Sequence, residues 1–299
     1  LHLSLRRQRQ MCIRDRRSLE VGFEVLTLKR EDVKVCIART GGTNCDLETK
    51  IAFEELGVKV DLLHSKRLLK ENRLLDYELL VFPGGFSYGD YVRAGAIWAK
   101  TLFSQLHEEL IKYVEEERLI MGICNGFQVL VEMGLLPAFS GITPHPEAAL
   151  STNLNAKYEC RWVYLKYENK SNCAFTKKLD TGALIRIPIG HGEGRFLFPK
   201  GKEQEYLKRL IDGDQLVFRY AKPDGSLAEG TYPFNPNGSL YDIAGICNPK
   251  GNVFGLMPHP ERAFFGWQLP DWTCLEDLPK YGDGWFIFES AIQHICENF

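Results

Sequence analysis

Short apolar runs alternate with longer stretches of helical periodicity in the first half of the chain. The runs are rich in valine, isoleucine and leucine, and we expect each of them to form a strand that is covered on both faces. They lie at residues 33–39, 58–64, 74–82 and 118–124. In the helical stretch 92–117, the positions that share one face are Trp98, Leu102, Leu106 and Leu110. Strands and helices in alternation predict a parallel sheet with helices on both faces.

After about residue 150 the pattern changes to strand-like segments separated by turn signals. The segments are YECRWVYLKY, ALIRIPIG, DQLVFRYA, YDIAGICN and GNVFGLM, and the turn signals are KPDGS, NPNGS and NPKGN. This half is therefore predicted to be rich in antiparallel hairpins, and residues 284–299 are predicted to form a terminal helix. We predict an α/β fold: a flavodoxin-like open, mostly parallel sheet with helices on both faces and antiparallel hairpin insertions in the C-terminal half.

The first 32 residues do not fit this pattern. Residues 1–17 hold six arginines and one aspartate, which gives them a charge of +5. The peptide MCIRDR at residues 11–16 is what a common sequencing adapter encodes, and our hypothesis is that residues 1–16 are a translated adapter. Source DNA that carries the same codons would contradict it. We assign residues 1–32 to a non-native or disordered extension and residues 33–299 to the domain.

Charge and cysteine content exclude several classes of function. Because the whole chain carries −2, the remainder after residue 17 carries −7, which gives no case for nucleic-acid binding. No apolar run approaches the ~18 residues of a membrane span. Nine cysteines, with no C-x-x-C pair, favour free thiols in a reducing cytoplasm. The cysteines and histidines lack zinc-ligand spacing, so no metal centre is predicted.

A cysteine lies where the apolar run 118–124 meets the next helix. The sequence Gly122-Ile-Cys124-Asn-Gly126 has the G-x-nucleophile-x-G form, in which small residues let a strand turn sharply into a helix. Such a turn lifts the side chain out of the strand end, and the helix N-terminus favours the thiolate. A buried structural cysteine, as Cys36 is expected to be, needs no such glycines. Cys124 is therefore the candidate nucleophile.

A thiol nucleophile needs a base and a group that orients the base. The triplet His-Pro-Glu occurs twice, at residues 145–147 and 259–261. In extended backbone the His and Glu of such a triplet point to the same side, so that the carboxylate can hold the imidazole in the proton-accepting tautomer. Only the second triplet follows a predicted strand, at the end of which open α/β sheets build their sites. We therefore assign His259 and Glu261, and expect His145 to be a solvated loop residue.

Attack on an amide carbonyl also needs backbone N–H groups that stabilise the oxyanion. One donor is expected from Asn125, which directly follows the candidate nucleophile. The other is expected from Pro83-Gly84-Gly85, where two residues without side chains follow a predicted strand. The sequence thus predicts an oxyanion site formed by Gly84 or Gly85 together with Asn125.

The order PGG, G-x-C-x-G-x-Q and H-x-E resembles the class I (triad) glutamine amidotransferase family, over residues 33 to about 295. Longer stretches, among them FPGGFSYGDYVRAGAIWAK, YECRWV, HGEGRF and GLMPHPER, are similar to the family of glutaminase subunits of phosphoribosylformylglycinamidine synthase. The resemblance implies that Cys124 is the nucleophile, His259 the general base and acid, and Glu261 the orienting group. It also implies that Gln128 helps to hold glutamine, and that His191 lies near the glutamine pocket or a partner interface.

The same resemblance implies the reaction and the partners. A cytoplasmic subunit of this kind hydrolyses L-glutamine and delivers ammonia to a synthetase, which converts formylglycinamide ribonucleotide to formylglycinamidine ribonucleotide in de novo purine biosynthesis. This chain has no G-x-x-x-x-G-K-[ST] loop, so no cofactor is expected in it. ATP and Mg are expected on the partner synthetase, and a small accessory subunit is expected as well. The stretch 263–285 is longer than in the compact bacterial form, and we expect its tryptophans to pack in the ordinary way.

Two other functions stay open at this point. One is a free-standing cysteine hydrolase of the same fold, either a γ-glutamyl hydrolase or a peptidase. Peptidases of that kind usually place a histidine directly after the nucleophile, where this chain has Asn125. The other is a non-catalytic assembly protein, against which the intact Cys, His and Glu speak.

Overall fold

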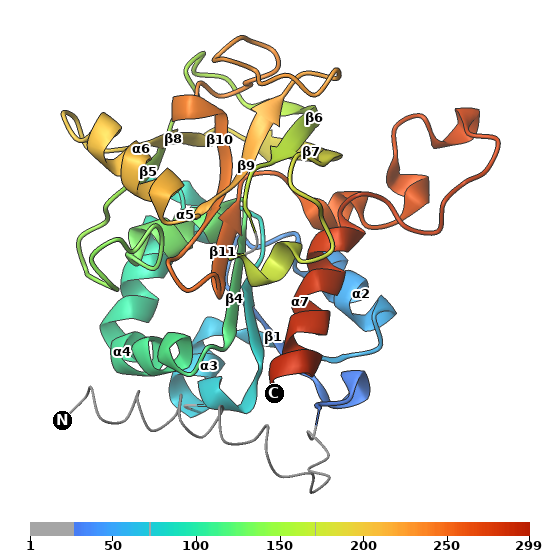
Figure 1. Ribbon diagram of the computed structural model, residues 1–299. Helices are drawn as coiled ribbons and strands as arrows, with labels where there is room; N and C mark the ends of the chain where they lie inside the picture. The colour runs from blue at the N-terminus through green and yellow to red at the C-terminus, as the bar shows by residue number, and fades with distance from the viewer. Residues whose placement is uncertain (1–26, 72, 171) are drawn as a thin grey trace, which may run out of the picture.

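The computed structural model describes residues 27–71, 73–170 and 172–299. Its centre is a nine-stranded sheet with the strand order β2-β1-β3-β4-β11-β10-β9-β6-β7, and β5 and β8 form a separate small sheet (Figure 1). The strands are β1 (Lys34–Arg39), β2 (Lys59–His64), β3 (Leu79–Phe82), β4 (Leu119–Ile123), β5 (Ala149–Ser151), β6 (Glu159–Tyr167), β7 (Leu184–His191), β8 (Arg195–Leu197), β9 (Leu216–Ala221), β10 (Ile243–Cys247) and β11 (Val253–Leu256).

Helices and 3₁₀ turns connect these strands. The helices are α2 (Asp46–Glu55), α3 (Ser65–Glu71), α4 (Ala96–Glu115), α5 (Asn125–Glu132), α6 (Glu203–Asp212) and α7 (Trp285–Asn298). The 3₁₀ turns are η1 (Arg30–Asp32), η2 (Leu74–Asp76), η3 (Ser87–Asp90), η4 (Ala174–Thr176), η5 (Leu240–Asp242), η6 (Pro260–Ala263), η7 (Gly266–Gln268) and η8 (Trp272–Cys274).

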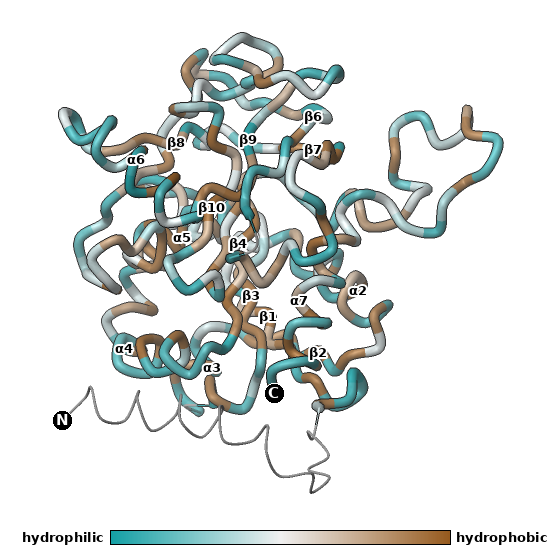
Figure 2. Tube along the Cα trace, in the orientation of Figure 1, coloured by the Kyte–Doolittle hydropathy of each residue, from teal (hydrophilic) through white to brown (hydrophobic). Residues whose placement is uncertain are grey.

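The strands β2, β1, β3, β4 and β11 pair in parallel. β3, β4 and β11 are buried along their whole length, and Figure 2 shows hydrophobic residues gathered on the central strands. The prediction of a parallel sheet is therefore confirmed. The expectation that every strand is covered on both faces was wrong for β2. Its exposed residues alternate with partly or fully buried ones, because β2 is the edge strand and lacks a neighbour on one side.

The remaining strands β10, β9, β6 and β7 pair antiparallel and continue the same sheet beyond β11. The predicted hairpins of the C-terminal half are thus present, and they enlarge the central sheet. As a result, β11 has a parallel neighbour on one side and an antiparallel neighbour on the other. The connection that follows β11 leaves from the middle of the sheet.

Helices cover both faces of the sheet, as the sequence predicts. Figure 1 shows α3, α4 and α5 on one face and α2 and α7 on the other. The face of α4 that was expected to be apolar is buried at Trp98, Leu102, Leu106 and Leu110. Among the described residues, no helix has the length and hydropathy that a bilayer crossing requires.

The first described residues of the chain meet its last helix, α7. Arg30 donates two hydrogen bonds to the carboxylate of Glu289, at 2.9 and 2.6 Å. Arg30 belongs to the predicted extension 1–32, and the boundary at residue 33 stays a prediction. The adapter hypothesis concerns residues 1–16, which lie outside the described residues.

The stretch 263–285 contains a segment that projects from the body of the molecule (Figure 1). Trp285 packs as expected, since its ring stacks on Tyr281 with centroids 5.3 Å apart. The ring of Trp267 stacks on Phe265, also with centroids 5.3 Å apart, but Trp267 and Trp272 are both largely exposed. Trp267 is 56% exposed and Trp272 is 45% exposed, because the segment that carries them extends away from the core.

Candidate active site

Cys124 occupies a strained turn between β4 and α5, which we call the elbow. Its φ of 50° and ψ of −104° are outside the regions that most side chains adopt. The turn is tight because the end of β3 lies against it: a Cβ on Gly126 would lie 1.8 Å from the carbonyl oxygen of Phe82. A Cβ on Gly122 would lie 2.7 Å from the backbone of Gly126. The two flanking glycines are therefore required by close backbone approach.

Replacing Gly126 with alanine is expected to destabilise the fold by about 3 kcal/mol or more, because the added methyl overlaps backbone that cannot move aside. Chemical denaturation monitored by tryptophan fluorescence measures the effect. Gly41→Ala is the matched control, since a Cβ at that position would meet no atom within 4 Å. Equal unfolding free energies for the two variants would contradict this account of the turn.

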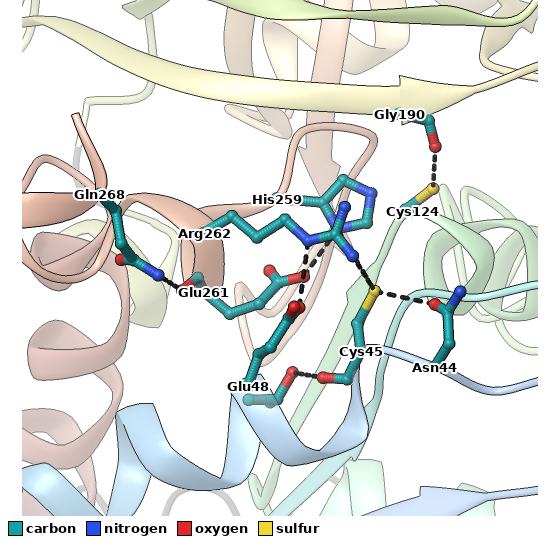
Figure 3. Close-up of polar contacts among 10 residues, drawn as sticks. Asn44, Cys45, Glu48, Cys124, Gly190, His259, Glu261, Arg262 and Gln268 are labelled. Carbon is teal, nitrogen blue, oxygen red and sulfur yellow. Dashed lines mark hydrogen bonds and ion pairs between the residues drawn. The ribbon is translucent and has the colours of Figure 1, made fainter. Parts of the chain in front are cut away.

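The structure brings His259 and Glu261 to the same sheet edge as Cys124 (Figure 3). β11 runs parallel to β4 with Leu256 opposite Ile123, so both strands end side by side. The Nδ1 atom of His259 lies 2.6 Å from Oε1 of Glu261, and both side chains are buried. Glu261 belongs to the 3₁₀ turn η6, so the two side chains meet through a turn of the chain and not through the extended backbone that the sequence suggested.

The pKa of His259 is set by burial and by two neighbouring groups, the carboxylate of Glu261 and the sulfur of Cys124. Burial by itself lowers the pKa of His259, but the Glu261 carboxylate and the sulfur of Cys124 raise the pKa well above its usual value. Nε2 of His259 has no fixed hydrogen-bond partner among the described residues, so it is free for proton transfer. Cys124 Sγ lies 3.6 Å from the carbonyl oxygen of Gly190. This arrangement favours the imidazolium form of His259 beside the sulfur of Cys124.

The residues expected at the oxyanion site lie next to this pair. A Cβ on Gly84 would lie 2.7 Å from Cε1 of His259, so only glycine fits there. Gly85 has a φ of 147° and packs against the backbone of residues 42–44. The amide N–H of Asn125 is in the first turn of α5, where N–H groups lack intrahelical acceptors. Its side-chain Oδ1 accepts a hydrogen bond from Ser87 N at 3.1 Å, which joins the glycine loop to the helix.

A family model for a CobB/CobQ-like glutamine amidotransferase domain matches residues 32–295. The PurQ subunit of phosphoribosylformylglycinamidine synthase from Archaeoglobus fulgidus is 46% identical over 278 residues, 90% of this chain and 99% of the relative. The chain belongs to the PurQ family of glutamine amidotransferases.

Further PurQ relatives are similar to this chain in sequence and in structure. The PurQ subunit of Dehalococcoides mccartyi is 41% identical over 262 residues, which cover 87% of this chain and 97% of that one. A chain in the solved structure of PurLQS from Thermotoga maritima is 36% identical with a TM-score of 0.65, covering 88% of this chain and 98% of its own. The similarity supports the α/β fold class that the sequence predicts.

Gln128 lies one turn along α5 in this PurQ-type site, with both ends of its amide bound to protein. Its Oε1 accepts a hydrogen bond from Nδ2 of Asn125 at 2.8 Å, and its Nε2 donates to the carbonyl oxygen of Glu193 at 2.6 Å. Gln128 thus holds the loop after β7 against α5. That contact shapes the wall of the site, and the predicted contact with glutamine stays a prediction.

His191 ends β7, directly after the carbonyl that faces Cys124. Its Nδ1 lies 3.2 Å from Oδ1 of Asn153, while Nε2 has no partner among the described residues. Burial and the nearby charge of His259 lower the pKa of His191 to about 3, so the ring is neutral at pH 7. The other predicted histidine, His145, lies in an exposed loop, as expected.

Cys45, which precedes α2, was not among the site residues predicted from the sequence. Its Sγ lies 3.9 Å from Nδ1 of His259 and 3.2 Å from Nη2 of Arg262. The two residues Cys45 and His259 are far apart in the chain, and the parallel order of β1 and β11 brings their following loops to one edge. The only sequence signal was the position of Cys45 just beyond the end of the first predicted strand.

Proposed function

We propose that the chain is the glutaminase subunit of phosphoribosylformylglycinamidine synthase and that Cys124, His259 and Glu261 are its catalytic triad. The observation that carries the proposal is the buried grouping of a carboxylate, an imidazole and an elbow cysteine in a chain of the PurQ family. Fold alone would not support it, since one fold hosts many functions.

In the proposed reaction, the Cys124 thiolate attacks the side-chain amide carbon of glutamine. The N–H groups of Gly85 and Asn125 stabilise the oxyanion of the tetrahedral intermediate. The His259 imidazolium donates a proton to the departing nitrogen, and ammonia leaves a γ-glutamyl thioester on Cys124. His259 then removes a proton from water, which attacks the thioester and releases glutamate. Glu261 keeps Nδ1 protonated, so that Nε2 carries out both proton transfers.

The ammonia is consumed by a partner in this proposal. Bulk water would protonate it, so the transfer requires a closed route to the enzyme that uses it. By similarity to the PurLQS assembly of Thermotoga maritima, the partners are a synthetase subunit and a small accessory subunit. The synthetase binds ATP, Mg²⁺ and formylglycinamide ribonucleotide, and this chain needs no cofactor of its own. The complex operates in the cytoplasm.

Glutamate release from glutamine, measured with and without the purified synthetase and accessory subunit, tests the function. We expect the partners to raise the rate by about tenfold or more, which corresponds to a barrier lowered by about 1.4 kcal/mol or more. Full activity of the isolated chain, unchanged by the partners, would instead identify a free-standing hydrolase. Failure of a glutamine-mimicking diazoketone to label Cys124 in the complete complex would identify a non-catalytic assembly protein.

A further inference from the structure

The imidazole of His259 has a thiol on each side. Cys124 interacts with it from the elbow, and Cys45 faces its Nδ1 edge from the start of α2 (Figure 3). The proposed reaction uses only Cys124. Burial raises the pKa of the Cys45 thiol, although the contact with His259 lowers it in part, so this second sulfur is not suited to be a second nucleophile.

We propose that Cys45, His259 and Glu261 form a binding site for a thiophilic divalent cation, with Zn²⁺ as the preferred ion, and that its occupancy inhibits the glutaminase. One ligand atom from each residue lies within 4.8 Å of the other two, and all three side chains are buried. Thiolate, imidazole and carboxylate are the three ligand types that zinc takes in proteins.

The distances are compatible with small ligand movements. Zinc lies roughly 2.0–2.3 Å from such ligands, so two ligands of a tetrahedral ion are about 3.4 Å apart. The separation of 3.9 Å between Cys45 Sγ and His259 Nδ1 is close to that value. Nδ1 and Oε1 of Glu261 are 2.6 Å apart, as a shared proton requires. The cation would replace that proton and move the two atoms apart by less than about 1 Å.

An unpartnered oxygen is a second and independent indication of a ligand. Oε2 of Glu261 is buried and makes no hydrogen bond within the described part of the chain. A buried carboxylate oxygen without a donor costs free energy, and a cation held beside the carboxylate would offset that cost. Figure 3 shows the carboxylate of Glu261 beside the imidazole of His259 and close to Cys45, so the unpartnered oxygen lies at the proposed metal site.

The positive charge of Arg262 repels a cation at this site and therefore weakens metal binding. Its Nη2 lies 3.2 Å from Cys45 Sγ, while its Nε donates to Oε2 of Glu48 at 3.0 Å. The side chain is 38% exposed, so the guanidinium can turn toward solvent and keep its bond to Glu48. The site therefore binds a metal only when the cation displaces this positive charge.

The inhibition follows from the tautomer of the bound imidazole, and only this consequence rests on the proposed function. A metal on Nδ1 leaves the single ring proton on Nε2, so the ring cannot accept a proton from Cys124 or from water. Binding releases the thiol proton of Cys45 and the Nδ1 proton to solvent. Glu261 becomes a metal ligand and no longer orients the ring toward the nucleophile.

Titration of the full chain with Co²⁺ tests the site without any activity measurement, because a coordinated thiolate gives a near-ultraviolet charge-transfer band. We expect Cys45→Ser to abolish the band and to weaken binding by at least 10- to 100-fold. The band should survive Cys124→Ser and the control Cys274→Ser, which changes an exposed thiol. Arg262→Gln should tighten binding. Cys45→Ala replaces Cys45→Ser where the latter fails to fold, as judged by its melting temperature.

Zn²⁺ inhibition of glutamate release from the complete complex, reversed by a chelator, is the second measurement. We expect Cys45→Ser to shift the inhibition curve to higher Zn²⁺ by the same factor as Co²⁺ binding. A charge-transfer band that persists in Cys45→Ser, or one lost in Cys124→Ser, would overturn the site. A complex without any glutaminase activity would refute the proposed function, and the Co²⁺ titration would still decide whether the metal site exists.

Discussion

Replacing Cys124 with serine is expected to lower glutamine-dependent synthesis by the complete complex on the order of 10⁴-fold or more. A serine hydroxyl is far less acidic than a thiol, so the His259 imidazole cannot generate an equivalent nucleophile. Synthesis supported by added ammonium salt should be unchanged, because the synthetase then bypasses the thioester. The comparison of the two rates in one preparation isolates the step that Cys124 performs.

The matched control is Cys160→Ser, which changes an exposed thiol and should leave both rates unchanged. A variant Cys124→Ser that keeps glutamine-dependent synthesis near the wild-type rate would refute the nucleophile assignment. Loss of both rates together would indicate instead that the substitution disrupts the complex, which gel filtration with the partners would reveal.

The second large effect is expected from Glu261→Gln, which should reduce glutamate release by about 10³- to 10⁴-fold while the protein stays folded. The carboxylate accepts the Nδ1 proton and stabilises the imidazolium, whereas the amide of glutamine is neutral and can present an N–H to the ring. The variant therefore loses both the tautomer and the charge that assist proton transfer.

The pH profile of Glu261→Gln distinguishes this role from a merely structural one. The Glu261 charge raises the pKa of His259 against the effect of burial. Without that charge the pKa of His259 falls, so the imidazolium that protonates the departing amide nitrogen disappears at lower pH. The alkaline limb of the rate profile should therefore move to lower pH in the variant.

Glu289→Gln is the control for removing a buried, paired carboxylate, since Glu289 lies on α7 and pairs with Arg30. It should leave the pH profile of glutamate release unchanged. An alkaline limb in Glu261→Gln at the same pH as in wild type would contradict the proposed role of the carboxylate.

Several features could be read from the sequence because they depend on neighbouring residues. Continuous apolar runs such as β4 are recognisable because a strand covered on both faces has no polar positions. Gly122 and Gly126 mark the elbow because backbone approaches within van der Waals distance there. The pairing of His259 with Glu261 was predictable because the two residues are only two positions apart. The backbone between them is a 3₁₀ turn and not the extended chain that the sequence suggested.

Other features depended on the order of the strands, which no local pattern contains. The insertion of β11 between β4 and β10 brings His259 to Cys124, and the nearby end of β1 brings Cys45 to the other side of the ring. Likewise, the side-chain amide of Gln128 donates a hydrogen bond to the loop after β7. The family resemblance had implied that this residue helps to hold the substrate glutamine.

The sequence by itself determined the strands, the elbow and the candidate triad, because local sterics and burial periodicity fix them. Only the tertiary structure decided that a second thiol and an unpartnered carboxylate oxygen meet at the same imidazole. Contacts between residues more than two hundred positions apart arise from sheet topology, and that topology is a property of the whole packed core.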